Sequence, residues 1–178
     1  MEQVNVLLIG SGGREHALAW AIAKSPLLKN FYIAPGNPGT SSLGENVQLD
    51  LDDFDDILAF AEDNEIDLVV VGPEQPLVDG ITDYLTDYGI NVFGPSKAAA
   101  MLEGSKSFAK SIMQKYNIPT AGYEVFDRHE ISKLESYLQE QVTYPVVLKA
   151  DGLAAGKGVF ICDNYHEASE HIDRIMND

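Results

Sequence analysis

The sequence predicts an α/β protein whose first part is a doubly wound parallel sheet. Through its first half, short apolar runs of strand length alternate with helical stretches, an order typical of a parallel sheet covered by helices on both faces. Almost every apolar run also ends in a turn rich in glycine or proline. The carboxyl ends of parallel strands share one edge, where open α/β sheets bind ligands.

The first element is a near-continuous apolar strand, Val4 to Ile9, which leads directly into a glycine turn. An alanine-rich helical stretch follows, from Ala17 to Lys24. Amide N–H groups at a helix N-terminus lack partners in the helix, and the helix dipole favours an anion there. The sequence therefore predicts a phosphate site formed by a single turn, which comprises Gly10, Ser11, Gly12, Gly13 and Arg14.

The same turn departs from the Gly-x-Gly-x-x-Gly fingerprint of dinucleotide-binding sheets. Glu15 stands where the third glycine would be. The second strand, Phe31 to Ala34, ends without the acidic residue that would hold a ribose hydroxyl. It is followed instead by the turn Pro35-Gly36-Asn37-Pro38-Gly39. We therefore expect a Rossmann-like sheet with a phosphate ligand smaller than NAD, and an oxidoreductase is disfavoured.

Further strands and helices complete the first unit. We expect a strand at Asn46–Leu49, a helix from about Asp53, a strand at Asp67–Val71, a helix around Leu77–Tyr88 and a strand at Ile90–Phe93. The helix from Asp53 carries apolar residues at the spacing of one buried face. The five aspartates within residues 50–56 are interpreted as its solvent-facing start rather than as a metal site.

Three turns at the carboxyl ends of these strands define a candidate pocket. Its predicted lining is Gly10–Arg14, Pro35–Gly39 and the turn of Gly72, Pro73 and Glu74, with Gly94–Ser96 at the same edge. Glu74 follows a wholly apolar strand, so it either lies at the pocket mouth, suited to hydroxyls or an amine, or is an acid at a helix N-terminus. His16 either lines the pocket or packs on the sheet.

The pattern changes near residues 100–120, where we place a boundary. Two helical stretches within Lys97–Lys115 are separated by Gly104. A smaller unit is expected beyond them, with a strand at Gly122–Phe126, a helix that buries Ile131, Leu134 and Leu138, strands at Pro145–Ala150 and Val159–Cys162, and a helix that buries Ala168, Ile172 and Ile175.

A glycine-rich loop joins the last two strands of this unit. Lys149 is the only charged residue in the run Val146–Ala150, and it precedes the loop Asp151–Gly158. The loop is not a Walker A loop, because its glycine spacing is too short and Gly158 replaces the Ser or Thr. A glycine turn between two strands can nevertheless cover nucleotide phosphates while a strand lysine contacts them from beneath. Taken alone, Lys149 is better explained as a solvent-facing residue on a half-buried strand, and it is the adjoining loop that favours a role in binding.

Charge and composition limit the possible partners. The 178 residues carry a formal net charge of -16, which argues against DNA or RNA. Residues 1–96 hold three cations against sixteen acids, whereas residues 97–178 hold nine against twelve, so lysines are concentrated where a polyphosphate would need them. No apolar run approaches the roughly 20 residues of a membrane span. The single cysteine, Cys162, fits a reducing compartment, and we expect a cytoplasmic location.

Six stretches of sequence carry a resemblance to a known family. They are VLLIGSGGREHALAW from Val6, IAPGNPGT from Ile33, VVGPEQPLVDGI from Val70, FGPSKAAAMLEGSKSFAK from Phe93, IPTA from Ile118 and YPVVLKADGLAAGKGV from Tyr144. In this order they are similar to the glycinamide ribonucleotide synthetase (phosphoribosylamine–glycine ligase) family of the ATP-grasp superfamily, over nearly the whole chain.

The resemblance implies a pre-ATP-grasp domain over residues 1–102, a helical linker over 103–121 that starts the ATP-grasp domain, and part of its small α+β lobe over 122–178. It also implies a ligase that joins glycine to phosphoribosylamine through glycyl phosphate, with release of ADP and phosphate. The pocket turns would bind phosphoribosylamine. ATP would be held by Lys106, Lys149, Gly152, Gly156, Lys157 and Gly158.

Members of this family are more than twice as long as this chain. The resemblance therefore implies an N-terminal fragment that is inactive alone. It places the carboxylate ligands of Mg²⁺ or Mn²⁺ beyond residue 178 and leaves no catalytic or metal-binding residue within the chain. Two alternatives stay open, namely another ATP-grasp carboxylate–amine ligase and a phosphosugar-binding module without catalytic activity.

Overall fold

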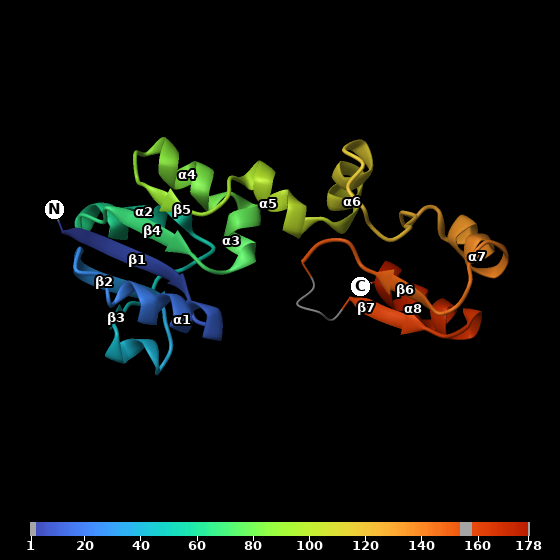
Figure 1. Cartoon of the computed structure of the whole chain (residues 1–178), viewed down its shortest axis with the longest axis horizontal. Helices are drawn as coiled ribbons and strands as arrows, with labels where there is room; N and C mark the ends of the chain where they lie inside the picture. Colours follow the sequence, from blue (N-terminus) through green and yellow to red (C-terminus); the bar gives the residue numbers. More distant parts are fainter. Residues whose placement is uncertain (1–2, 154–157, 178) are drawn as a thin grey trace. The chain divides into compact units, whose positions relative to one another are not determined.

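The computed structural model describes residues 3–153 and 158–177 (Figure 1). The chain forms two compact units, residues 1–101 and residues 102–178. Each unit has a sheet and hydrophobic core of its own.

Five parallel strands form the sheet of the first unit, in the order β3-β2-β1-β4-β5. The strands are β1 (Val4–Gly10), β2 (Leu28–Pro35), β3 (Glu45–Asn46), β4 (Leu68–Val71) and β5 (Val92–Phe93). In the register of the central strand, Leu8 lies opposite both Ile33 and Val70. β2 and β3 lie on one side of β1, and β4 and β5 lie on the other side. This order confirms the doubly wound fold predicted from the sequence.

Helices cover both faces of this sheet. Successive side chains of a strand point to opposite faces, so β1 contributes to two cores. Val6 and Leu8 pack in the core that contains Ala19 of α1 (Gly13–Ile22). Leu7 and Ile9 pack in the core with α2 (Phe54–Asp63), α3 (Glu74–Asp79), α4 (Ile81–Asp87) and Ala100 of α5 (Lys97–Gly104). All four β1 side chains are buried, which fixes the strand between two helical layers.

Three elements of the first unit differ from the sequence-based expectation. The strand predicted at Ile90–Phe93 is limited to Val92–Phe93. The stretch Leu77–Tyr88, predicted as one helix, is divided between α3 and α4 at Gly80, whose φ is +107°. Glycine adopts this left-handed conformation readily, and it ends a helix. The predicted strand at Asn46–Leu49 is also shorter. Only Glu45–Asn46 pairs with β2, whereas Val47 and Leu49 pack against the core.

The second unit is built on an antiparallel hairpin. Its strands are β6 (Val146–Lys149) and β7 (Val159–Cys162), and α6 (Lys106–Lys115) precedes them in the chain. One face of the hairpin packs in a core with Leu134 and Leu138 of α7 (Ile131–Glu140) and Ala168 and Ile172 of α8 (Tyr165–Asn177). This arrangement confirms the expected α+β unit.

The strand predicted at Gly122–Phe126 is not formed, and residues 121–127 are neither helix nor strand. One of the two aromatic residues of this segment packs against the helices instead. Phe126 contacts the core of the second unit, and its ring centroid lies 5.4 Å from that of Tyr137. Burial against a helix thus produces a pattern of apolar residues that resembles a half-buried strand, without the ladder of hydrogen bonds that defines one.

Candidate functional site

Three of the predicted turns lie together at the carboxyl edge of the first sheet. They follow β1, β2 and β4, which are parallel neighbours. Two hydrogen bonds join the first turn to the second. The amide of Gly36 donates to the carbonyl of Gly10 at 3.2 Å, and the side-chain amide of Asn37 donates to the carbonyl of Ser11 at 2.9 Å. The turns Gly10–Arg14 and Pro35–Gly39 are therefore in direct contact.

Asn37 also holds the second turn in shape. Its Oδ1 accepts hydrogen bonds from the amides of Gly39 at 2.8 Å and of Thr40 at 3.1 Å, as in an Asx turn. The first of its glycines, Gly36, has a φ of +69°. The imidazole of His16 lies so close to Gly39 that a Cβ there would be 2.5 Å from its Cε1. His16 thus borders this turn and is exposed rather than packed on the sheet.

An ion pair links the first turn to the third. The guanidinium of Arg14 donates to both oxygens of Glu74, at 2.6 and 2.9 Å. Pro73 is the N-cap residue of α3 and Glu74 is its first residue, so the pair joins the starts of two helices. The hydrogen bonds from Arg14 hold the pKa of Glu74 below its usual value. The two side chains are 69% and 38% exposed, so solvent screens the pair and it contributes little to stability.

Glu15, which sequence reasoning treated only as a departure from the dinucleotide fingerprint, lies beneath these turns. The residue is only 4% exposed. Its Oε2 accepts a hydrogen bond from the amide of Gly12 at 2.6 Å, so one of the amides predicted to bind phosphate already has a partner. The signal in the sequence was the capping-box position, in which a Glu at the third helical residue reaches back to the N-cap amide.

The second predicted site is organised by Asp151, at the start of the glycine-rich loop. Its carboxylate accepts hydrogen bonds from the amides of Lys106 at 2.6 Å and Ser107 at 3.2 Å, and from the hydroxyls of Ser105 and Ser107. Burial raises the pKa of Asp151, but the hydrogen bonds from Ser107, Ser105 and Gly152 outweigh burial and lower it to about 2. An anionic side chain therefore occupies the N-terminus of α6 and attaches the loop to it.

The side chain of Lys106 also contacts the glycine-rich loop. Its ammonium donates a hydrogen bond to the carbonyl of Gly152 at 2.7 Å. At the far end of the loop, the carbonyl of Gly158 accepts from the amide of Ala150 at 2.7 Å. The structure thus brings Lys106, Gly152 and Gly158 to one loop, whereas Gly156 and Lys157 lie outside the described residues.

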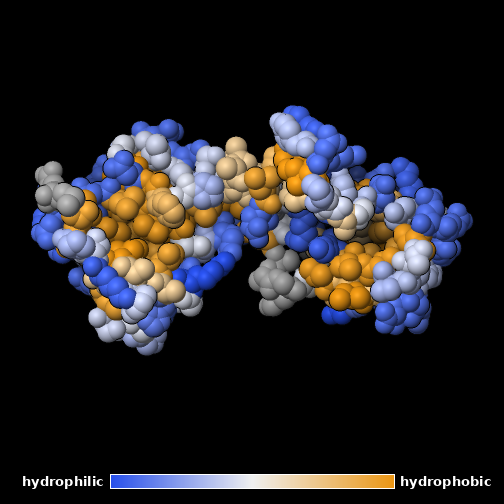
Figure 2. All heavy atoms as spheres, in the orientation of Figure 1, coloured by the Kyte–Doolittle hydropathy of each residue, from blue (hydrophilic) through white to orange (hydrophobic). Residues whose placement is uncertain are grey.

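Lys149 shares an exposed face of the hairpin with apolar side chains that sequence reasoning did not single out. Val147 and Ile161 are opposite each other on this face, as are Lys149 and Val159. Val147, Val159 and Ile161 are 51%, 42% and 70% exposed, and Figure 2 shows hydrophobic residues gathered over this hairpin. A lysine beside an apolar surface suits a ligand with an anionic group and a flat ring.

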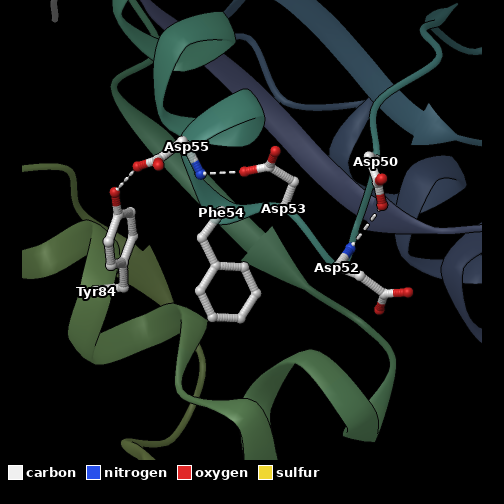
Figure 3. Close-up of a pocket in the computed structure, with 6 residues that line it drawn as sticks. All are labelled: Asp50, Asp52, Asp53, Phe54, Asp55 and Tyr84. Carbon is white, nitrogen blue, oxygen red and sulfur yellow. Dashed lines mark hydrogen bonds between the residues drawn. The ribbon is translucent and has the colours of Figure 1, made fainter.

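The aspartate-rich stretch before α2 is a helix start, as predicted. Asp53 is the N-cap residue and accepts hydrogen bonds from the amides of Asp55 and Asp56. Figure 3 shows Asp55 pointing toward Tyr84, and its carboxylate accepts a hydrogen bond from the Tyr84 hydroxyl. This hydrogen bond raises the pKa of Tyr84. Within residues 3–153 and 158–177, no three His, Cys, Asp or Glu side chains are grouped so as to hold a metal ion. No helix in these ranges is long and apolar enough for a bilayer span.

The Asp151 carboxylate should contribute stability that depends on pH. Because its pKa is lowered to about 2 in the folded chain, this contribution is complete above the pKa of the unfolded chain, near 4. It is lost as the pH falls from about 4 to about 2. We expect Asp151→Asn to lower the free energy of unfolding at pH 7 by about 1 kcal/mol, less than the full shift implies because the carboxylate is partly exposed.

Denaturant unfolding of both forms at pH 7 and near pH 2 measures this difference, which should disappear at the lower pH. Asp163→Asn, which changes an exposed aspartate of the same unit, is the matched control. Equal stability of wild type and Asp151→Asn at pH 7 would contradict the role of the carboxylate as an anchor.

Comparison with known protein families gives two adjoining matches. Residues 4–103 match the family "Phosphoribosylglycinamide synthetase, N domain", and residues 104–178 match "Phosphoribosylglycinamide synthetase, ATP-grasp (A) domain". A curated phosphoribosylamine–glycine ligase of Rhodopirellula baltica is 51% identical over 180 residues, which cover 98% of this chain and 41% of that protein.

Solved structures show the same likeness. The phosphoribosylamine–glycine ligase of Thermotoga maritima is 38% identical with a TM-score of 0.72, over 94% of this chain and 38% of that one. The biotin carboxylase domain of Hydrogenobacter thermophilus 2-oxoglutarate carboxylase, in complex with MgADP, ADP and bicarbonate, has a TM-score of 0.76 at 18% identity, over 99% of this chain and 41% of that one. The second likeness is one of fold alone. The chain spans about two fifths of the length of these relatives.

Proposed function

The chain belongs to the phosphoribosylglycinamide synthetase family, and we propose that it supplies the phosphosugar site and the beginning of the ATP site of a phosphoribosylamine–glycine ligase. The observation that carries the proposal is that two successive domains of this family match adjoining parts of the chain, residues 4–103 and 104–178. Both parts match this one family, which favours it over another ATP-grasp ligase.

The proposed reaction has two steps. A carboxylate oxygen of glycine attacks the γ-phosphorus of ATP, ADP leaves, and glycyl phosphate is formed. The amine of phosphoribosylamine then attacks the glycyl carbonyl, phosphate leaves, and the nitrogen gives up a proton as the amide bond forms. Both steps develop negative charge on phosphate oxygens, so the main requirement on the protein is to position the reactants and to place positive charge beside those oxygens.

We assign phosphoribosylamine to the edge formed by Gly10–Arg14, Pro35–Gly39 and Gly72–Glu74. The first turn of α1 provides amide donors that have no acceptor within the helix. Residues 1–96 contain only three cations, Arg14, Lys24 and Lys29, and Arg14 is the one in the turn. Because Glu74 holds its guanidinium, the phosphate has to compete for Arg14, which would release Glu74 to meet the hydroxyls or the amine of the sugar.

We assign ATP to the second unit. The apolar face of Val147, Val159 and Ile161 would lie against the base, and Lys149 on the same face would contact the phosphates. Lys106 and the loop from Gly152 to Gly158, with Gly156 and Lys157, would complete the phosphate contacts. The bond from Lys106 to the Gly152 carbonyl already places that ammonium beside the loop.

Phosphoryl transfer of this kind also requires divalent cations, which would offset the negative charge of the ATP phosphates. Among residues 3–153 and 158–177, no three His, Cys, Asp or Glu side chains are grouped so as to hold a metal ion by themselves. The proposal therefore assigns the ligands of Mg²⁺ or Mn²⁺ to parts of the relatives that this chain does not span. Because the chain spans about two fifths of the length of its relatives, a second candidate for the 178 residues alone is a phosphosugar-binding module without catalytic activity.

Arg14 and Glu74 should have opposite effects on phosphosugar binding. Arg14→Ala should weaken the binding of ribose 5-phosphate to this chain about tenfold or more, because a charged hydrogen bond to phosphate is lost. Glu74→Gln should strengthen it severalfold, because the glutamine no longer neutralises Arg14. Isothermal titration calorimetry measures both effects, with Lys24→Ala as the control that removes a cation away from the turn. Unchanged affinity in Arg14→Ala would argue against this site.

Catalysis should require the parts of the relatives that this chain does not span. We expect the 178-residue chain to show no glycine-dependent ATP hydrolysis, and a chain extended to the length of its relatives to show it. In the extended chain, Lys149→Ala should lower ATP use about a hundredfold, as loss of one electrostatic contact to a reacting group does. Release of ADP in the presence of glycine and phosphoribosylamine is the measurement. Glycine-dependent ADP release by the short chain would contradict the expectation.

A further inference from the structure

Glu15 is an anionic side chain buried beneath a predicted anion site. It is the third residue of α1, and its Oε2 accepts the amide hydrogen of Gly12 at 2.6 Å. Its other oxygen, Oε1, is buried and has no hydrogen-bond partner among residues 3–153 and 158–177. The Gly12 amide at the start of α1 is thus the hydrogen-bond donor identified for this carboxyl group.

The side chain fills the space between the turns that follow β1 and β4. A Cβ atom would lie 2.4 Å from Glu15 Cγ at Gly10, 2.8 Å from Oε2 at Gly12 and 2.5 Å from Oε1 at Gly72. Three glycines therefore close over one glutamate. No larger residue fits at any of the three positions while Glu15 keeps its place, so the carboxylate is held where it is by backbone on several sides.

The position of the carboxylate bears on which phosphate ligands the turn can accept. In a dinucleotide-binding turn, the second glycine lets the backbone approach the pyrophosphate, and the third allows close helix–strand packing. Here Gly12 stands at the second position, and its amide already donates to Glu15, which replaces the third glycine. A diphosphate entering this turn would meet an occupied donor and a fixed like charge. One phosphate can still use other amides of the first turn and Arg14.

We propose that Glu15 determines which class of phosphate ligand the turn binds. Its carboxylate occupies the Gly12 amide and the space that the second phosphate group of a diphosphate would need. The turn therefore accepts sugar monophosphates and rejects sugar diphosphates. The inference rests on the proposed function, because it takes the turn Gly10–Arg14 as the site of the sugar phosphate.

Amide NMR of the ¹⁵N-labelled chain tests this selectivity, since shifts at Gly10, Gly12 and Gly13 report on this turn and shifts at Gly152 and Gly158 report on the loop of the second unit. The probes are ribose 5-phosphate and ribose 5-diphosphate. We expect the wild type to bind the monophosphate at the turn at least tenfold more tightly. In Glu15→Ala, which removes both charge and volume, the two affinities should come within about threefold. Glu62→Gln, at an exposed position on α2, is the control and should keep the preference.

Glu15→Gln provides a second reading if Glu15→Ala does not fold, because glutamine keeps the shape and can still accept from Gly12. Loss of the charge alone should reduce the tenfold preference at least threefold. Equal binding of both probes by the wild type would overturn the inference, as would an unchanged preference in a folded Glu15 variant. Absence of any shift at the turn with ribose 5-phosphate would remove the proposed phosphosugar site itself, and with it this inference.

Discussion

Parallel pairing of β1 with a strand on each side is the constraint on which the first unit depends. Each residue of β1 from Val6 to Ile9 has partners in both β2 and β4. This pairing places the carboxyl ends of three strands side by side. The turns that follow these strands therefore lie close together. The bond from Asn37 to Ser11 and the ion pair between Arg14 and Glu74 are both consequences of that arrangement.

Both units attach a glycine-rich turn to a helix N-terminus through a carboxylate. In the first unit Glu15 reaches back from α1 to the amide of Gly12. In the second unit Asp151 reaches from its loop to the amides that begin α6. Glycine turns lose much conformational entropy on ordering. A carboxylate bound at a helix N-terminus offsets part of this cost, because the amides and the dipole of the helix stabilise it there. The two carboxylates thus order the backbone that the proposed ligands would contact.

The sheet could be predicted because its strands are coded locally. The apolar run from Val4 to Ile9 and the glycine turn after it are visible without knowledge of the fold, and the alternation of strands and helices predicts parallel order. The break at Gly80 was missed because an isolated glycine within a helical pattern often stays helical. The false strand at Gly122–Phe126 arose because Phe126 packs, partly buried, against α7 rather than taking part in a β-ladder.

The residues of the site were harder to predict than its turns. Arg14 and Glu74 are 60 positions apart, and their pairing follows from the adjacency of β1 and β4, which no local pattern encodes. Asp151 contacts Lys106 across 45 positions for a similar reason. The exposed face of Val147 and Ile161 could not be predicted because both strands are apolar on both faces. No alternation of polar and apolar residues indicates which face is covered. These contacts are properties of the assembled fold rather than of any segment.

The two-stranded sheet of the second unit has a consequence for behaviour in solution. Within the part of the chain that the structure describes, β6 and β7 pair only with each other, so each has an outer edge of backbone donors and acceptors. These edges adjoin the exposed side chains of Val147 and Ile161. An open edge beside an apolar, β-branched surface is a template for strand addition from another molecule. The hairpin face to which we assign the nucleotide base is therefore also a surface prone to self-association, and a ligand lying on it would cover these apolar side chains.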